Sequence, residues 1–216
     1  GSVYEGEWRA DEKSGSGKLT AASGDIYEGS FLNGMKYGEG RLVDYETGEV
    51  YEGSFKRDMR HGRGKLTSSD GTCFDSNWVD GNHCGRGIMT FASGDVFEGY
   101  IVNGMMHGHG HRICAASGSI YEGNYHEDMR HGAGRLTCSD GSVYEGSFVK
   151  GVKSGRGTLI ETNGATYEGD FVDDLKHGHG KCTLPDGSVY EGGYVHGEVH
   201  GRGRFVADGD EYEGDW

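Results

Sequence analysis

The sequence has few of the residues from which thick hydrophobic cores and membrane spans are built. Only 33% of its 216 residues are hydrophobic, which argues against a large globular core. No apolar run approaches the roughly 18 residues that a membrane-crossing helix needs. A single proline, Pro185, and 24 aromatic residues argue against a disordered chain, although the formal net charge is −14.

Cysteines and basic residues are also scarce. The five cysteines are Cys73, Cys84, Cys114, Cys138 and Cys182, an odd number without a CxxC pair, which argues against a disulfide framework and favours a reducing compartment. Lys and Arg together number 21, against 35 Asp and Glu, which disfavours nucleic acids and anionic membranes as partners. We therefore expect a soluble, cytoplasmic protein with no nucleic-acid partner.

Glycine is abundant, with 43 residues, and its spacing reveals an internal repeat. The tripeptide YEG, or a variant of it, begins at Tyr4, Tyr27, Tyr51, Phe74, Phe97, Tyr121, Tyr144, Tyr167, Tyr190 and Tyr212. Most of these starts lie 23 residues apart. The chain therefore contains nine complete repeats and the first strand of a tenth.

Each repeat is numbered here from its Tyr or Phe as position 0. Position 4 is aromatic in nine of ten copies: Trp8, Phe31, Phe55, Trp78, Tyr125, Phe148, Phe171, Tyr194 and Trp216, with Ile101 as the exception. Positions 11 and 13 are glycine in all nine complete repeats, and position 15 is usually Leu. Because strand side chains alternate with period two, positions 0, 2 and 4 share one face of a predicted strand.

Short turn-forming stretches such as NGMK and RDMR separate the two halves of each repeat and predict a hairpin. Folding there pairs positions that sum to 15. This register places an acid opposite a base in six hairpins: Glu5/Lys18, Glu28/Arg41, Glu52/Lys65, Glu122/Arg135, Glu168/Lys181 and Glu191/Arg204. It also sets the aromatic residue at position 4 opposite the glycine at position 11, leaving room for rings to cover bare backbone.

A second loop, with glycine three residues before each position 0, joins successive hairpins into an antiparallel meander. The prediction is an all-β fold: an elongated, solenoid-like single antiparallel sheet of consecutive β-hairpins. One face carries the rings and glycines. The other face carries the acid–base ladder.

The repeat resembles the MORN (membrane occupation and recognition nexus) family, whose consensus is similar to YEGSFxxGxxHGxGxLTxxDGSV. Three departures are local: Phe74-Asp75-Ser76 replaces Tyr-Glu-Gly, Cys84 replaces the usual His, and Ile101 replaces a ring. The resemblance covers residues 1–216 as one continuous MORN array of consecutive MORN β-hairpins. Gly1 falls inside the repeat pattern and Trp216 ends within a repeat, so we expect a fragment of a longer array.

The resemblance implies a non-enzymatic scaffold, like the nearly pure MORN arrays that organise cytoskeletal and membrane-associated structures. Catalysis is not expected, and no cofactor is required. The stretch GHGKCT, which begins at Gly178, is only superficially similar to a phosphate-binding loop, because its glycines belong to the repeat and the GK[ST] ending is absent.

Two protein-binding surfaces follow from this reading. The first is a partner groove lined by rings: Tyr27, Phe31, Tyr51, Phe55, Tyr121, Tyr125, Tyr144, Phe148, Tyr167 and Phe171. The alternative is that these rings only shield glycines and one another. The second is a homodimer interface at the C-terminal repeats, where GDEYEGDW forms a strand without its own hairpin: Tyr190, Tyr194, Phe205, Tyr212 and Trp216.

Two further hypotheses remain open. A peripheral phospholipid-binding module would use basic loop residues, namely Lys36, Arg60, Arg130, Lys153 and Lys176. A zinc site would use imidazole and thiolate ligands, for which the candidates are Cys84, His107, His109, His111 and His126. The leading hypothesis is a cytoplasmic scaffold, associated with the cytoskeleton, that forms homodimers and binds protein partners.

Overall fold

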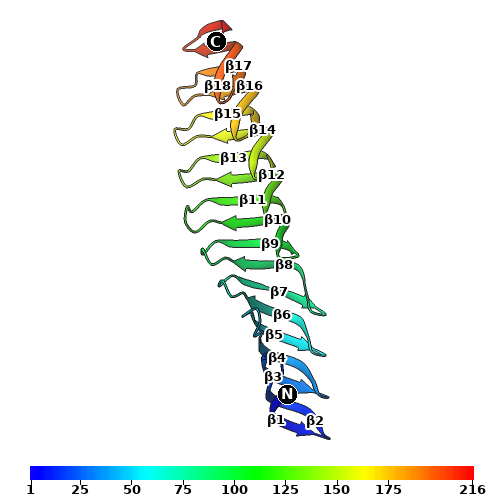
Figure 1. The fold of residues 1–216 in the computed structure, drawn as a ribbon. Coiled ribbons are helices and arrows are strands. Elements are labelled where there is room, and N and C mark those ends of the chain that lie inside the picture. Colours follow the sequence, from blue (N-terminus) through cyan, green and yellow to red (C-terminus); the bar gives the residue numbers. More distant parts are fainter. The chain divides into compact units, whose positions relative to one another are not determined.

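The structure, a computed structural model, describes residues 1–216 except for the side chain of Cys84. Strands, turns and loops make up this part of the chain, and it contains no helix. Two compact units divide it, Gly1–Ile101 and Val102–Trp216. Within each unit, consecutive strands lie side by side (Figure 1). The all-β fold of consecutive antiparallel hairpins is therefore confirmed.

The first unit holds nine strands and the second holds ten. The first contains β1 (Val3–Arg9), β2 (Glu12–Thr20), β3 (Ile26–Leu32), β4 (Met35–Val43), β5 (Val50–Lys56), β6 (Met59–Thr67), β7 (Cys73–Val79), β8 (Asn82–Thr90) and β9 (Val96–Val102). The second contains β10 (Met105–Ile113), β11 (Ile120–His126), β12 (Met129–Thr137), β13 (Val143–Val149), β14 (Val152–Ile160), β15 (Thr166–Val172), β16 (Leu175–Thr183), β17 (Val189–Val195), β18 (Glu198–Ala207) and β19 (Asp210–Asp215).

Two-residue turns close the hairpins. In the turn after β3, Asn33 and Gly34 both have positive φ, 49° and 76°. Two successive positive φ values define a type I′ turn, whose twist matches that of the flanking strands. The loops that join one hairpin to the next are longer, as at residues 68–72, where Gly71 donates to the Ser68 carbonyl. Between β18 and β19, Asp208 and Gly209 form a two-residue turn instead.

The predicted register is correct in the first half of eight hairpins. In the hairpin of β13 and β14, Tyr144 lies opposite Leu159 and Gly146 opposite Gly157. The six acid–base pairs predicted from the sequence all lie opposite one another. Each such base also faces an acid of the following repeat: Lys18 lies opposite Glu5 and Glu28 and forms a 2.7 Å ion pair with Glu28.

A β-bulge after position 2 changes the second half of the hairpin and corrects one prediction. The register shifts between Gly146 and Phe148, so that Phe148 lies opposite Lys153. The aromatic residue at position 4 therefore does not face the glycine at position 11 of its own hairpin. Gly155 instead faces Phe171 of the next repeat. It has a φ of 75°, and all nine position-11 glycines have φ between 59° and 80°, so the backbone conformation itself favours glycine there.

The core consists of rings that cover glycine backbone. Tyr144 is fully buried, and its ring lies over the glycine pair Gly146 and Gly157. Its hydroxyl donates a 3.0 Å hydrogen bond to the carbonyl of Ser147, the bulged residue. The ring also makes T-shaped contacts with Phe148 at 5.1 Å and with Phe171 of the next repeat at 4.9 Å. A single sheet thereby buries its aromatic residues by packing them in sequence.

Candidate functional site

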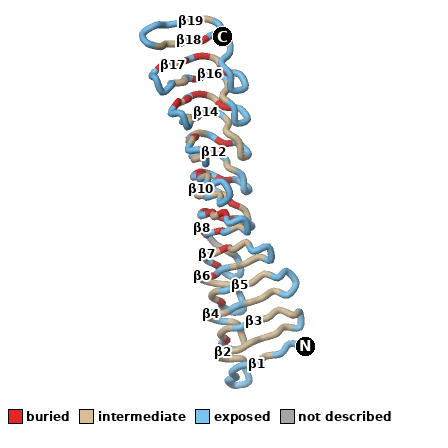
Figure 2. Tube along the Cα trace, turned by 90° about the vertical axis from the view of Figure 1, so that its left-hand side faces the viewer, coloured by how far each residue is buried: buried red, intermediate tan, exposed pale blue. Residues whose placement is uncertain are grey.

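The rings predicted to line a partner groove are buried rather than open to solvent. Their exposed fractions do not exceed 4%, and the residues concerned are Tyr27, Phe31, Tyr51, Phe55, Tyr121, Tyr125, Tyr144, Phe148, Tyr167 and Phe171. In Figure 2 the buried residues lie on the strands, while the connecting loops are mostly exposed. The prediction of an open, ring-lined groove is thus corrected: the rings form the core, and a partner would meet the atoms that cover them.

Basic side chains provide part of that cover. Lys153 places its ammonium group 5.3 Å from the centre of the Tyr144 ring, and Lys176 lies 5.1 Å from that of Tyr167. Such cation–π contacts favour the charged side chain over the ring face. The five bases assigned to loops in the phospholipid hypothesis all lie on strands, namely β4, β6, β12, β14 and β16. These bases do not lie in loops, because each turn is only two residues long. Each base comes two residues after its turn and therefore lies within the following strand.

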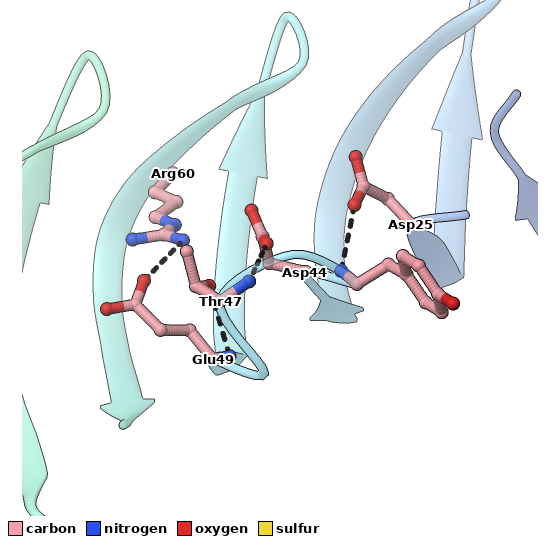
Figure 3. Close-up of polar contacts among 6 residues, drawn as sticks. Asp25, Asp44, Thr47, Glu49 and Arg60 are labelled. Carbon is pink, nitrogen blue, oxygen red and sulfur yellow. Dashed lines mark hydrogen bonds and ion pairs between the residues drawn. The ribbon is translucent and has the colours of Figure 1, made fainter. Parts of the chain in front are cut away.

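Acids from the longer loops partly neutralise these bases. Lys176 forms a 2.6 Å ion pair with Glu161, and Arg60 lies 4.0 Å from Glu49 (Figure 3). The loop that carries Glu49 is held by its own hydrogen bonds: Thr47 donates its backbone N–H to Asp44, and Glu49 donates to the Thr47 hydroxyl. The first of these bonds lowers the pKa of Asp44.

The hairpin turns connect successive repeats. The backbone N–H of Asp174 donates to the Lys153 carbonyl of the preceding repeat at 3.1 Å, and the Lys153 N–H donates to the Asp174 carboxylate at 2.8 Å. Gly197 makes the corresponding backbone bond to Lys176 at 2.8 Å. Each repeat therefore fixes the next through its turn as well as through its strands.

The ladder face of the second unit is hollowed. A hollow of about 770 Å³ spans β10 to β15, with the glycines of positions 2 and 13 among its lining. Its charged and polar lining includes Glu122, Arg135, Glu145, Arg156, Thr158 and Glu168. Sequence reasoning identified this face only as an acid–base ladder and did not predict the hollow. The missing base at Thr158, in a position that usually holds Lys or Arg, was the available signal.

Exposed apolar side chains lie on the same face, near the hairpin turns. Val149, Val172 and Val195 occupy position 5 of successive repeats and are 44%, 47% and 37% exposed. Because each follows a buried ring at position 4, strand alternation directs it away from the ring face. Val149 and Val172 lie on β13 and β15, two of the strands that line the hollow, whereas Val195 lies on β17.

The residues predicted for the dimer interface divide into two groups. Trp216 contacts Tyr190 at 5.1 Å, Tyr212 at 5.4 Å and Phe205 at 6.2 Å between ring centres. Tyr212 and Trp216 are 51% and 43% exposed. Tyr194 is buried instead, with its ring 4.9 Å from that of Tyr167.

The candidate zinc ligands do not all converge. The His107 ring lies 5.2 Å from that of His126, which in turn lies 5.8 Å from His131, a residue that the sequence analysis did not include. His109 and His111 lie opposite Asn124 and Glu122 instead. Among the side chains that the structure describes, no group of three His, Cys, Asp or Glu is arranged to hold a metal ion. Cys84 lies outside those described side chains, and the zinc site stays a prediction.

Two sequence features can be placed directly. GHGKCT lies within strand β16, whereas a phosphate-binding loop would precede a helix. In the part of the chain that the structure describes, there is no helix long and apolar enough to cross a membrane.

Comparison with solved structures identifies relatives of the fold. The TCP10 domain of Danio rerio CPAP, in complex with a peptide of Danio rerio STIL, matches with a TM-score of 0.55 at 13% identity, covering 100% of this chain and 99% of that chain. A mutant of the same domain matches with a TM-score of 0.50 at 14% identity, over 87% of this chain and 86% of that one. At such low identity, the likeness concerns the fold alone.

Sequence comparison identifies longer relatives. Human Alsin is 32% identical over 110 residues, which is 50% of this chain and 5% of Alsin. The ALS2 C-terminal-like protein of Bos taurus is 29% identical over 109 residues, 50% of this chain and 9% of that protein. The chain therefore spans only a small part of the curated relatives that it matches.

The repeats themselves match a family model along almost the whole chain. Nine matches to the MORN repeat cover residues 4–26, 27–45, 51–73, 74–96, 97–118, 121–143, 144–166, 167–189 and 190–211. Their starts coincide with positions 0 derived from the spacing of Tyr and Phe. The chain belongs to the MORN repeat family.

Proposed function

We propose that this chain is a non-enzymatic scaffold that binds protein partners on the ladder face of its sheet. The observation that carries the proposal is the hollow of about 770 Å³ on the second unit, with the exposed apolar side chains of Val149 and Val172 on two of the strands that line it. Protein-binding surfaces commonly combine apolar anchors with polar surroundings. The CPAP TCP10 domain, which has a related fold, is in complex with a STIL peptide, and this supports a peptide or protein as the occupant. The MORN resemblance supports a cytoplasmic, cytoskeletal setting.

The proposal includes self-association through the C-terminal repeats. Tyr212 and Trp216 present half-exposed rings next to Tyr190. Aromatic residues are frequent energetic anchors of interfaces. Pairing of this surface with a second copy around a two-fold axis would cover both rings.

Solution mass tests the dimer. Light scattering across a concentration series should give twice the monomer mass for the wild-type chain, and the double variant Tyr212→Ala/Trp216→Ala should shift the equilibrium to monomer. Tyr45→Ala is the matched control, because Tyr45 is 75% exposed in the first unit. A monomer mass for the wild-type chain at all concentrations would refute self-association.

Affinity capture followed by chemical cross-linking tests partner binding. Cross-links should map to the ladder face of β10–β15. Substitution of the Phe148 or Phe171 ring would not test this surface, because both rings are buried and their loss would destabilise the repeats. Cross-links confined to other surfaces would refute the assignment of the binding face.

A further inference from the structure

We call a position-14 residue, together with the acids opposite it on the two neighbouring strands, a rung of the acid–base ladder. One rung within the hollow lacks its base. In the preceding rung, Arg135 lies opposite Glu122 on one side and Glu145 on the other, and its guanidinium is 3.6 Å from the Glu145 carboxylate. In the next rung, Thr158 takes this place, between Glu145 and Glu168. A hydroxyl cannot neutralise two carboxylates. This rung therefore carries an excess of negative charge.

Neighbouring bases do not compensate fully. Glu168 forms no ion pair with any side chain that the structure describes, and Glu145 is paired only with Arg135. Arg156 lines the hollow and lies opposite Asp170 in register, without an ion pair to Glu168. Lys181 lies opposite Glu168 on its other side but forms no ion pair with it, so a cationic group at Thr158 would meet one carboxylate without an ion pair and one shared with Arg135.

The first unit offers a direct comparison. There Ile88 occupies the same position, opposite Asp75 and Glu98. Both of those acids are paired, Asp75 with Arg63 at 3.3 Å and Glu98 with Arg86 at 3.6 Å. The hollow at Ile88 is also smaller, about 180 Å³. A missing base does not by itself leave a charged site, and the Thr158 rung differs in both charge and space.

Apolar side chains frame the rung at both ends. Ile160 follows Thr158 by two residues on β14, on the same face, and is 45% exposed. At the other end, Val149 continues the strand of Glu145, and Val172 continues the strand of Glu168. A ligand along β14 would therefore meet an apolar group, two carboxylates, the Arg156 side chain and a second apolar group in turn.

We infer that this surface docks a basic polypeptide segment in an extended conformation, with one Lys or Arg over Thr158 between Glu145 and Glu168. Apolar side chains of the segment pack on Ile160 and on the pair Val149 and Val172. At about 3.3 Å per residue, the cation and its apolar neighbours lie two to four residues apart in the partner. This inference rests on the proposed function and specifies the partner chemistry of the same face.

Charge favours this occupant over others. The formal charge of −14 attracts basic segments over a long range, and complementarity accelerates their association. An acidic peptide or a nucleic acid would meet three glutamates and only two arginines in the lining of the hollow, and one of these, Arg135, is already paired with Glu145. The apolar frame distinguishes a polypeptide from a small polyamine, which has no side chains to bury there.

Fluorescence anisotropy of a labelled peptide tests the inference on the full chain. The peptide carries one Arg, with Leu at the second and fourth residue on either side and Ser or Gly elsewhere. We expect saturable binding that weakens at least about tenfold when Arg is replaced by citrulline, which keeps the shape and removes the charge. Equal binding of the citrulline peptide would overturn the inference.

Variants locate the site. Thr158→Lys restores the rung, as Lys181 does in the next repeat, and should weaken binding about tenfold while leaving circular dichroism unchanged. Glu168→Gln should weaken it similarly, and Arg156→Ala should strengthen it by removing a competing base. Ile88→Lys, which fills the paired rung of the first unit, is the matched control and should have no effect. Equal losses from Ile88→Lys and Thr158→Lys would overturn the site.

The outcome remains separable from that of the proposed function. Loss of peptide binding in Thr158→Lys, with partner cross-links also lost, supports the inference. Absence of peptide binding to the wild-type chain overturns it, even where cross-linking still maps a protein partner to the ladder face.

Discussion

Tyr144 and Gly157 fit together so closely that neither can change independently. A Cβ on Gly157 would lie 2.5 Å from the Cε2 and hydroxyl oxygen of Tyr144, well inside van der Waals contact. The same arrangement recurs in most repeats, for example Tyr167 over Gly180. The position-13 glycine is thus the place where a small change is expected to cost the most.

Gly157→Ala should therefore destabilise the second unit by about 3 kcal/mol, because the buried ring cannot move away. Urea unfolding followed by circular dichroism measures this loss. Gly155→Ala is the matched control. Gly155 has a positive φ, but a Cβ added there would lie 3.7 Å from its nearest side-chain atom, on Ser147. It should cost only about 1 kcal/mol of backbone strain. A larger loss for Gly155→Ala would contradict ring packing as the dominant constraint.

Alkaline pH should unfold the chain through its buried tyrosines. Burial raises the pKa of Tyr27, Tyr51 and Tyr144 from 10.0 to about 12. Between pH 10 and 12 the unfolded state loses phenol protons that the folded state keeps, so stability is full below pH 10 and falls as the pH rises through 12. Phenolate absorbance and circular dichroism, followed together, should change in one transition. Ionisation of these phenols without loss of structure would contradict the prediction.

Asp174, whose carboxylate accepts a hydrogen bond from the preceding repeat, should tolerate replacement by glycine but not by alanine. Asp174 has a φ of 68° and accepts a hydrogen bond from the Lys153 backbone, whereas Gly151 and Gly197 fill the same position elsewhere. Asp174→Gly loses the hydrogen bond but relaxes the backbone, and should be nearly neutral. Asp174→Ala loses the bond and keeps the strain, at a cost of about 2 kcal/mol by thermal or urea unfolding. Similar stability of both variants would rule out backbone strain as the cause.

The cation over the Tyr167 ring should contribute to stability beyond its hydrophobic stem. Lys176→Met keeps the stem and removes the ammonium, which lies 5.1 Å from the ring centre and 2.6 Å from Glu161. The expected loss is about 1 kcal/mol in urea unfolding, since the pair is largely shielded from solvent. Lys181→Met, on the exposed ladder face, should change stability much less. Equal losses would show that the ring contact adds nothing.

Anionic vesicles should not retain the chain at physiological salt. The bases of the phospholipid hypothesis cover rings, and Arg60 and Lys176 lie beside acids of the loops. Co-sedimentation with phosphatidylserine and phosphoinositide vesicles measures this directly. Tight, headgroup-selective binding would contradict the prediction and favour the phospholipid hypothesis.

Much of the fold follows from the sequence because the same chemistry recurs in every repeat. The acid at position 1 and the base at position 14 gave the register, and Asn33-Gly34 gave a tight turn. The bulge was missed. Its signal was present in glycines such as Gly155, but these were assigned to ring clearance, whereas the structure assigns them to positive φ.

The candidate site was harder to predict, because exposure depends on neighbouring repeats. Phe171 was expected to line a groove, but its contact with Tyr144 of the preceding repeat buries it. The hollow on the opposite face has no motif of its own. Thr158 replaces a Lys or Arg in that rung, but Ile88 and His111 do so in two other repeats, so the sequence alone did not single it out.

The turn-to-strand hydrogen bonds have a consequence for how such chains change length. Turns of successive repeats bond to the equivalent carbonyl of the repeat before them, as Asp174 does to Lys153 and Gly197 to Lys176. Excision of residues 144–166 would bring Val143 directly before Tyr167 and recreate an equivalent junction. Loss or duplication of one whole repeat would thus leave the structure of the junction unchanged. Loss of a single residue would instead place rings where carboxylates belong.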